Sequence, residues 1–178
     1  AKRNHSTGLG IYEYYGYGSR PHELPGTETT GLHGNARRIR GNVQDGITSI
    51  SAQATDNWGA NGLGYYIANR IMWNPEADVD ALRQDFLDKA FGPAASAADR
   101  FYSRFDADEM ALPGMSMLRA CADDLQDASR LAGDRPSIRN RIDDLKKIVV
   151  YSFLAEKVRA ATDKGEEKDL ALKQFTWA

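Results

Sequence analysis

The stretch from Gly46 to Pro75 constrains the fold of this chain more than any other. Ile47 to Thr55 is rich in β-branched residues and follows the turn pair Asp45-Gly46, which predicts a strand. Apolar residues spaced three and four apart then predict a helix that ends at Asn74-Pro75. Between the two, residues 56–62 (DNWGANG) predict a polar loop. Loops at the carboxyl ends of parallel strands often carry chemistry, because the strands hold them rigidly. We therefore look for function here first.

The remaining pattern predicts one more strand and several helices. Residues 8–15 predict a strand and Leu32–Val43 a helix, so the first 75 residues read as strand–helix–strand–helix with parallel strands. After Pro75 the spacing predicts only helices, the first capped by Asp78 and the last long one starting at Pro136 or Ser137. The predicted class is mainly α with a small parallel β part. We expect a βαβα portion at 1–75 and an α-helical region at 76–178.

A sheet of two parallel strands is physically incomplete. Each strand has an unpaired edge and a half-covered face, whereas parallel sheets are normally buried among helices. The chain is therefore expected either to assemble with other copies or to be the C-terminal part of something longer. We favour the second interpretation.

Charge and composition exclude several functions. The net charge of −2 favours neither nucleic acid nor a membrane surface as partner, and no apolar run approaches the roughly 20 residues of a membrane span. No signal peptide is visible at the start of the sequence. Three histidines without paired spacing argue against a metal site, and we expect no cofactor. The single cysteine, Cys121, lies on an apolar helical stripe, which predicts a buried hydrophobic residue.

Glu13 is the candidate catalytic residue. In the predicted strand it shares a face with Leu9 and Ile11, where alternation does not predict a carboxylate. If that face points into a barrel, a carboxylate near the carboxyl end of the strand would act in catalysis or ligand binding. The alternative is an edge strand on which Glu13 is simply hydrated.

Asp56, Asn57 and Trp58 are candidate substrate-binding residues. A pyranose offers hydroxyls to acids and amides, and a C–H face to an aromatic ring. The alternative is that Asn57 or Asn61 caps the following helix while Trp58 fills the core. Three further candidates, which could as well be packing residues, are Tyr14, Tyr15 and His22.

Two segments carry a family resemblance. GIYEYYG and QATDNWGANGLGYYIANRIMWNPEADVDALRQDFLDKAFGPAA resemble the bacterial domain of unknown function 4838, most specifically over residues 62–94. Members of that family look like carbohydrate-active enzymes, distantly similar to α-glucuronidases and hexosaminidase-type glycoside hydrolases. The resemblance implies a (β/α)₈ barrel followed by helices, in a periplasmic or extracellular parent protein. The two strands here would be the seventh and eighth.

The resemblance also implies a mechanism and a limit. Such enzymes hydrolyse a glycosidic bond with two carboxyl groups, and in such barrels these usually lie partly or wholly on earlier strands. We therefore expect this chain to contribute sugar-binding residues and to lack activity by itself.

Two other classes of function remain open. A nucleotide-binding unit would need its glycines in another order than Gly59-x-x-Gly62-x-Gly64. A non-catalytic helical domain with a structural or interaction role is the alternative.

Overall fold

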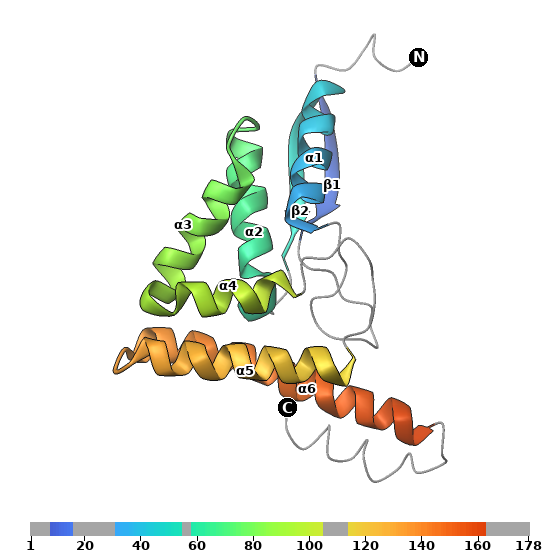
Figure 1. Ribbon diagram of the computed structural model, residues 1–178. Helices are drawn as coiled ribbons and strands as arrows, with labels where there is room; N and C mark the ends of the chain where they lie inside the picture. Colours follow the sequence, from blue (N-terminus) through green and yellow to red (C-terminus); the bar gives the residue numbers. More distant parts are fainter. Residues whose placement is uncertain (1–7, 16–30, 55–57, 105–113, 163–178) are drawn as a thin grey trace.

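The computed structural model describes residues 8–15, 31–54, 58–104 and 114–162 (Figure 1). It is mainly helical with a small parallel sheet, which confirms that part of the predicted class. The elements follow the order β1 (Leu9–Tyr14), α1 (Gly31–Gln44), β2 (Ile47–Gln53), α2 (Trp58–Trp73), α3 (Val79–Phe91), the 3₁₀ turn η1 (Gly92–Ala94), α4 (Ala95–Ser103), α5 (Met115–Ala132) and α6 (Pro136–Thr162).

The two strands pair in parallel, as the sequence predicts, and α1 covers one face of the pair (Figure 1). Ile11 lies opposite Ile50, and Glu13 lies opposite Ala52. The chain turns from α1 into β2 at Gly46, whose φ of 82° is a conformation that glycine adopts without strain. Tyr12 is exposed, and its hydroxyl donates to Gln53 Oε1 at 2.8 Å. The pair therefore has one face against a helix and one that carries polar and aromatic side chains.

Helix α2 starts at Trp58, five residues before Leu63, where its apolar pattern begins. Residues 58–62 were expected to be part of a loop, but they form its first turns. Two glycines lower the helix propensity of this segment. A tertiary contact stabilises the first turn of α2, because the Tyr102 hydroxyl donates to the Gly59 carbonyl at 2.8 Å. Trp58 is consequently a helical residue, not a loop residue.

Helix α3 begins where the sequence predicts. The Asp78 side chain accepts hydrogen bonds from the amides of Asp80 at 2.8 Å and Ala81 at 3.0 Å. These amides lower the pKa of Asp78, so the cap is ionised at neutral pH. The link before α3 is held by Arg40 of α1, whose guanidinium donates to the carbonyls of Pro75 at 2.6 Å and Ala77 at 2.9 Å. Helices α1, α2 and α3 are thereby fixed to one another.

One hydrophobic core runs through both halves of the chain. Its buried residues come from α1 through to α6, among them Ile39, Leu63, Phe101 and Leu145. Cys121 of α5 is fully buried, and burial raises the pKa of its thiol to about 11. The sequence-based interpretation of Cys121 as a small buried residue is confirmed.

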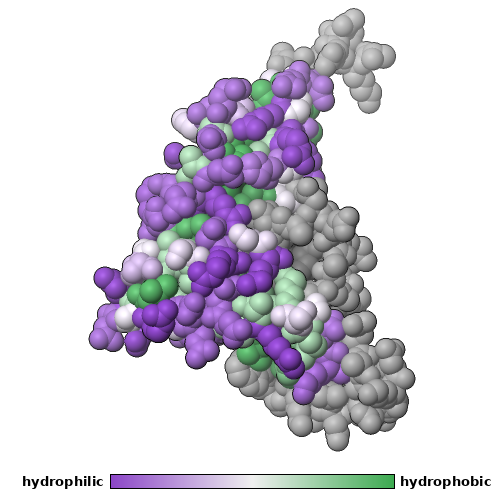
Figure 2. All heavy atoms as spheres, in the orientation of Figure 1, coloured by the Kyte–Doolittle hydropathy of each residue, from purple (hydrophilic) through white to green (hydrophobic). Residues whose placement is uncertain are grey.

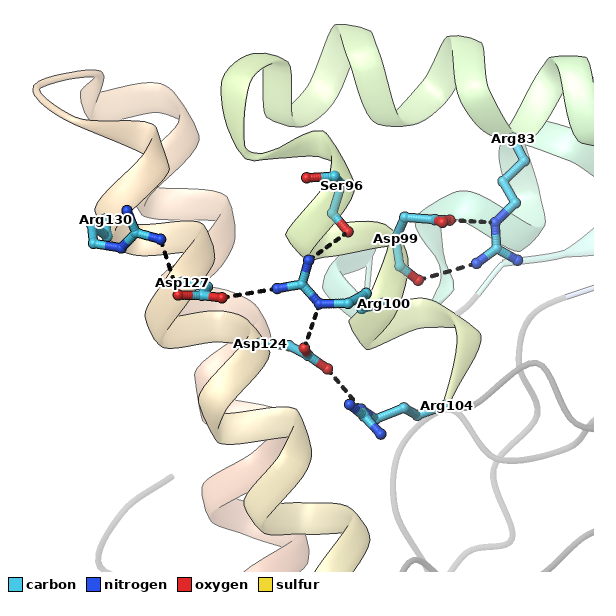
Figure 3. Close-up of polar contacts among 8 residues, drawn as sticks. All are labelled: Arg83, Ser96, Asp99, Arg100, Arg104, Asp124, Asp127 and Arg130. Atoms are coloured by element: carbon cyan, nitrogen blue, oxygen red, sulfur yellow. Dashed lines mark hydrogen bonds and ion pairs between the residues drawn. The ribbon is translucent and has the colours of Figure 1, made fainter.

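Ion pairs join α3, α4 and α5 (Figure 3). Asp124 of α5 has a side chain only 7% exposed, and its carboxylate accepts from Arg100 at 2.8 Å and from Arg104 at 2.6 Å. On the other side of α4, Arg83 of α3 donates to Asp99 at 2.7 Å. These contacts hold α4 between its two neighbours.

The visible surface is mainly polar. Figure 2 shows hydrophilic residues over most of this face, with the hydrophobic ones in small separate patches. No helix within the described ranges has both the length and the apolar character that crossing a membrane requires.

Candidate functional site

A hollow of about 450 Å³ opens between α2, α3, α4 and α6. Its size lies in the range of small-molecule sites in proteins. Five aromatic side chains line it, namely Trp58, Tyr66, Phe86, Phe91 and Tyr102. The hollow therefore offers an aromatic surface built from three consecutive helices and closed by a fourth from the end of the described chain.

The aromatic rings pack edge to face. The Phe86 ring centroid lies 6.4 Å from that of Phe91 and 6.4 Å from that of Tyr102, and the last two are 6.1 Å apart. This geometry is favourable for aromatic pairs and holds the rings in fixed orientations. Burial raises the pKa of Tyr102, which stays neutral and keeps its hydrogen bond to α2. The base of the hollow is thus rigid.

Trp58 stands at the edge of the hollow and is 59% exposed. One edge contact steadies its ring, which lies 5.1 Å from the Tyr65 ring at an interplanar angle of 60°. The glycine one turn later leaves room beside it: a Cβ atom on Gly62 would lie 3.9 Å from Trp58 and 3.8 Å from Phe86. The alternative in which Trp58 fills the core is therefore wrong, and much of its surface is open to a ligand.

Polar groups surround the aromatic surface. The Asn69 side chain donates from Nδ2 to the Tyr65 carbonyl at 2.8 Å, and no described residue donates to its Oδ1. The Tyr66 hydroxyl donates to Asp85, and Lys89 pairs with the same carboxylate at 2.6 Å. The bond to Asp85 raises the pKa of Tyr66, while Lys89 first and Tyr66 second lower the pKa of Asp85. Tyr66 is thus a neutral phenol and Asp85 an ionised carboxylate.

Glu13 lies elsewhere, on the face of β1 that α1 covers. Its carboxylate is 3.7 Å from the Arg38 guanidinium, which also lies over the Tyr15 ring at 5.2 Å. In a barrel, the helix that follows a strand covers the outer face. Glu13 thus faces α1 and is not among the residues that line the hollow beside Trp58, and its catalytic role stays a prediction.

The remaining sequence candidates divide into two groups. Tyr15 is buried against α1, where the Asn35 side chain donates to its carbonyl at 3.3 Å, so a ligand cannot reach its ring. Tyr14 ends β1, but its side chain lies outside the described part of the structure, as do His22, Asp56 and Asn57. Trp58 is thus the candidate that the described residues place beside the hollow, and the four candidates outside the description stay predictions.

Most residues of the hollow were not singled out from the sequence. Tyr66 and Phe86 fall on apolar helical stripes, where packing is the ordinary interpretation. Arg141 and Asp144 of α6 also line the hollow, although more than 65 residues separate them from Tyr66. The available signal was the concentration of aromatic residues in the sequence of α2 and α3, next to a glycine-containing helix start.

No metal site is evident in the part of the chain that the structure describes. Within residues 8–15, 31–54, 58–104 and 114–162, no three histidine, cysteine, aspartate or glutamate side chains are placed to hold an ion.

Comparison with protein families gives one match. The model of the family described as Domain of unknown function (DUF4838) matches residues 5–104, which include β1, β2 and α1 to α4. Comparisons with curated proteins and with solved structures find no match. Every aromatic residue of the hollow lies within the matched range, whereas its α6 residues lie beyond it.

Proposed function

The chain belongs to the Domain of unknown function (DUF4838) family, and on this premise we propose that it binds a carbohydrate as the C-terminal part of a glycoside hydrolase-like enzyme. The observation that carries the proposal is Trp58, an exposed tryptophan beside a hollow lined with aromatic rings. The ring of Trp58 can cover the C–H face of a pyranose.

The polar groups of the hollow suit sugar hydroxyls. Asn69 Oδ1 can accept a hydrogen bond from a ligand, and the Tyr66 oxygen, which donates to Asp85, can accept one as well. A sugar ring would thus meet an aromatic face and hydrogen-bonding groups together, as binding of a polyol with apolar C–H patches requires.

This chain is proposed to bind and not to catalyse by itself. Glycoside hydrolysis needs one carboxyl group with a raised pKa as the acid and a second as base or nucleophile. The pKa of Asp85 is lowered, and Glu13 lies against α1, away from the hollow. The catalytic carboxyl groups are therefore proposed to come from preceding barrel strands, of which β1 and β2 would be the last two.

A second candidate is a helical interaction domain without a sugar ligand. Its support is the apolar character of the hollow, which would also accept an apolar side chain of a partner protein. In that case oligosaccharides would not bind, and the experiment below separates the two functions.

Replacing Trp58 with alanine is expected to weaken oligosaccharide binding tenfold or more. The lost contact between ring and sugar contributes about 1–2 kcal/mol, and about 1.4 kcal/mol corresponds to a factor of ten. Because Trp58 is 59% exposed, the melting temperature should change little. Isothermal titration calorimetry with uncharged and acidic oligosaccharides measures the affinity.

Trp73→Ala is the matched control. Trp73 lies at the opposite end of α2, is 90% exposed and does not line the hollow. Its replacement removes the same side chain from the same helix and should leave affinity unchanged. Equal affinity of the wild type and Trp58→Ala would contradict the proposal.

A further inference from the structure

Two guanidinium groups line the hollow, each from a different helix. Arg70 comes from α2 and Arg141 from α6. Among the described residues, the Arg70 side chain forms neither a hydrogen bond nor an ion pair, although its charge helps to lower the pKa of the nearby Asp85 carboxylate, after the larger effects of Lys89 and Tyr66. Arg141 donates only to backbone carbonyls, those of Ala90 at 3.1 Å and Ser137 at 3.2 Å. Within the part of the chain that the structure describes, neither side chain is paired with a carboxylate.

The nearby carboxylates are already paired with lysines. Asp85 is bound by Lys89 at 2.6 Å and also accepts from the Tyr66 hydroxyl. Asp144, which lines the hollow, pairs with Lys147 at 2.7 Å on the next turn of α6. Each carboxylate therefore has a lysine bonded to it, and although the charge of Arg70 also acts on Asp85, neither guanidinium is bonded to a carboxylate within the described residues.

We propose that the hollow binds an acidic sugar, whose carboxylate or sulfate group pairs with Arg70 and Arg141 while its ring lies against Trp58. A guanidinium presents parallel N–H donors that match the oxygens of such an anion. An uncharged sugar would displace water from both arginines without supplying an opposite charge. This inference rests on the proposed carbohydrate function and adds the charge of the ligand.

The test uses the whole 178-residue chain and oligosaccharides of defined charge. The probes are uronic-acid oligomers, sulfated galactose oligomers, and uncharged glucose and xylose oligomers of equal length. Calorimetry at low salt should show at least tenfold tighter binding of an acidic probe than of the uncharged ones. Raising the salt concentration should weaken the binding of the acidic probe selectively, because salt screens charge pairs at a surface.

Arg70→Gln should reduce the affinity for the acidic probe about tenfold and leave that for uncharged probes unchanged. Arg139→Gln is the control. It removes an exposed arginine of α6 that pairs with Asp134 at 3.5 Å and does not line the hollow. Because the Arg70 side chain makes no hydrogen bond or ion pair within the described residues, its replacement should also leave the melting temperature unchanged.

The outcomes separate this inference from the function it rests on. Tight binding of uronic-acid or sulfated probes that depends on Arg70 supports it and identifies the anion. Uncharged probes could instead bind in a way that depends on Trp58 and is unchanged in Arg70→Gln. That result would overturn the inference of an acidic ligand and leave the proposed carbohydrate function intact. If Arg139→Gln lost as much affinity for the acidic probe as Arg70→Gln, the effect would come from the net charge of the protein, and the inference would be overturned. Binding of no probe would overturn both.

Discussion

Replacing Asp124 with alanine is expected to lower the free energy of unfolding by about 2–3 kcal/mol, because hydrogen bonds to charged groups each contribute about 1.5–3 kcal/mol. Asp124 is the buried acceptor between Arg100 and Arg104 that joins α5 to α4 (Figure 3). The loss should fall below the about 3–5 kcal/mol typical of a broken buried ion pair. Both arginines are partly exposed and can regain water. Urea titration followed by circular dichroism measures the change.

Asp127→Ala serves as its control. Asp127 lies on the same helix and pairs with Arg100 at 3.0 Å, but its side chain is 49% exposed. Exposed ion pairs contribute at most about 1 kcal/mol, so this replacement should have a small effect. Equal losses in the two variants would show that burial of Asp124 is unimportant.

The contribution of Asp124 should also depend on pH. Burial favours the protonated acid, but the hydrogen bonds and charges of Arg104 and Arg100 outweigh it, so the pKa of Asp124 lies below its usual 3.8. The carboxylate therefore stabilises the fold fully at a pH above that usual value. Its contribution is lost as the pH falls through the lower folded-state pKa. The difference between wild type and Asp124→Asn should shrink over that acidic range and stay constant at neutral pH.

Phe91→Ala is expected to have the largest effect on stability, about 3–5 kcal/mol, as for other buried phenylalanines. Phe91 is 2% exposed and packs against Phe86 and Tyr102 at the base of the hollow. Its removal leaves a cavity where α3 meets α4. Urea titration should show a lower midpoint with an unchanged slope.

Phe91→Leu keeps much of the buried volume and should cost only about 1–2 kcal/mol. A loss in Phe91→Ala as small as that in Trp58→Ala would contradict the assignment of Phe91 to structure and Trp58 to binding. Phe91 and Trp58 line the same hollow, so this comparison distinguishes a residue that stabilises the site from one that contacts the ligand.

Elements with strong local signals could be predicted from the sequence. Helix α5 follows Pro113-Gly114 in the sequence and ends before Gly133, and its apolar spacing agrees with the observed bounds 115–132. The first turn of α2 could not be predicted, because Gly59 and Gly62 weaken it locally. A hydroxyl 43 residues away in the sequence contacts its Gly59 carbonyl. A pattern within a short stretch of sequence does not indicate such a long-range contact.

The candidate site was predictable only in part, for a related reason. Strand alternation shows that Glu13 shares a face with Ile11, but not which face α1 will cover. Exposure of Trp58 follows from the polar residues around it, whereas the aromatic surface beside it forms only when α3 and α4 pack on α2. The positions of Arg141 and Asp144 depend on how α6 crosses the other helices. Tertiary packing, not residue type, brings these groups together.

The central claim is that the hollow beside Trp58 binds a sugar. The most direct test follows the tryptophan indole N–H signals of ¹⁵N-labelled protein while uronic-acid or uncharged oligosaccharides are added. A Trp58→Phe variant assigns the signal, and Trp73 at the other end of α2 provides the internal control. We expect the Trp58 signal to shift along a saturating curve while that of Trp73 stays fixed. A Trp58 signal that stays fixed with every oligosaccharide would contradict the claim.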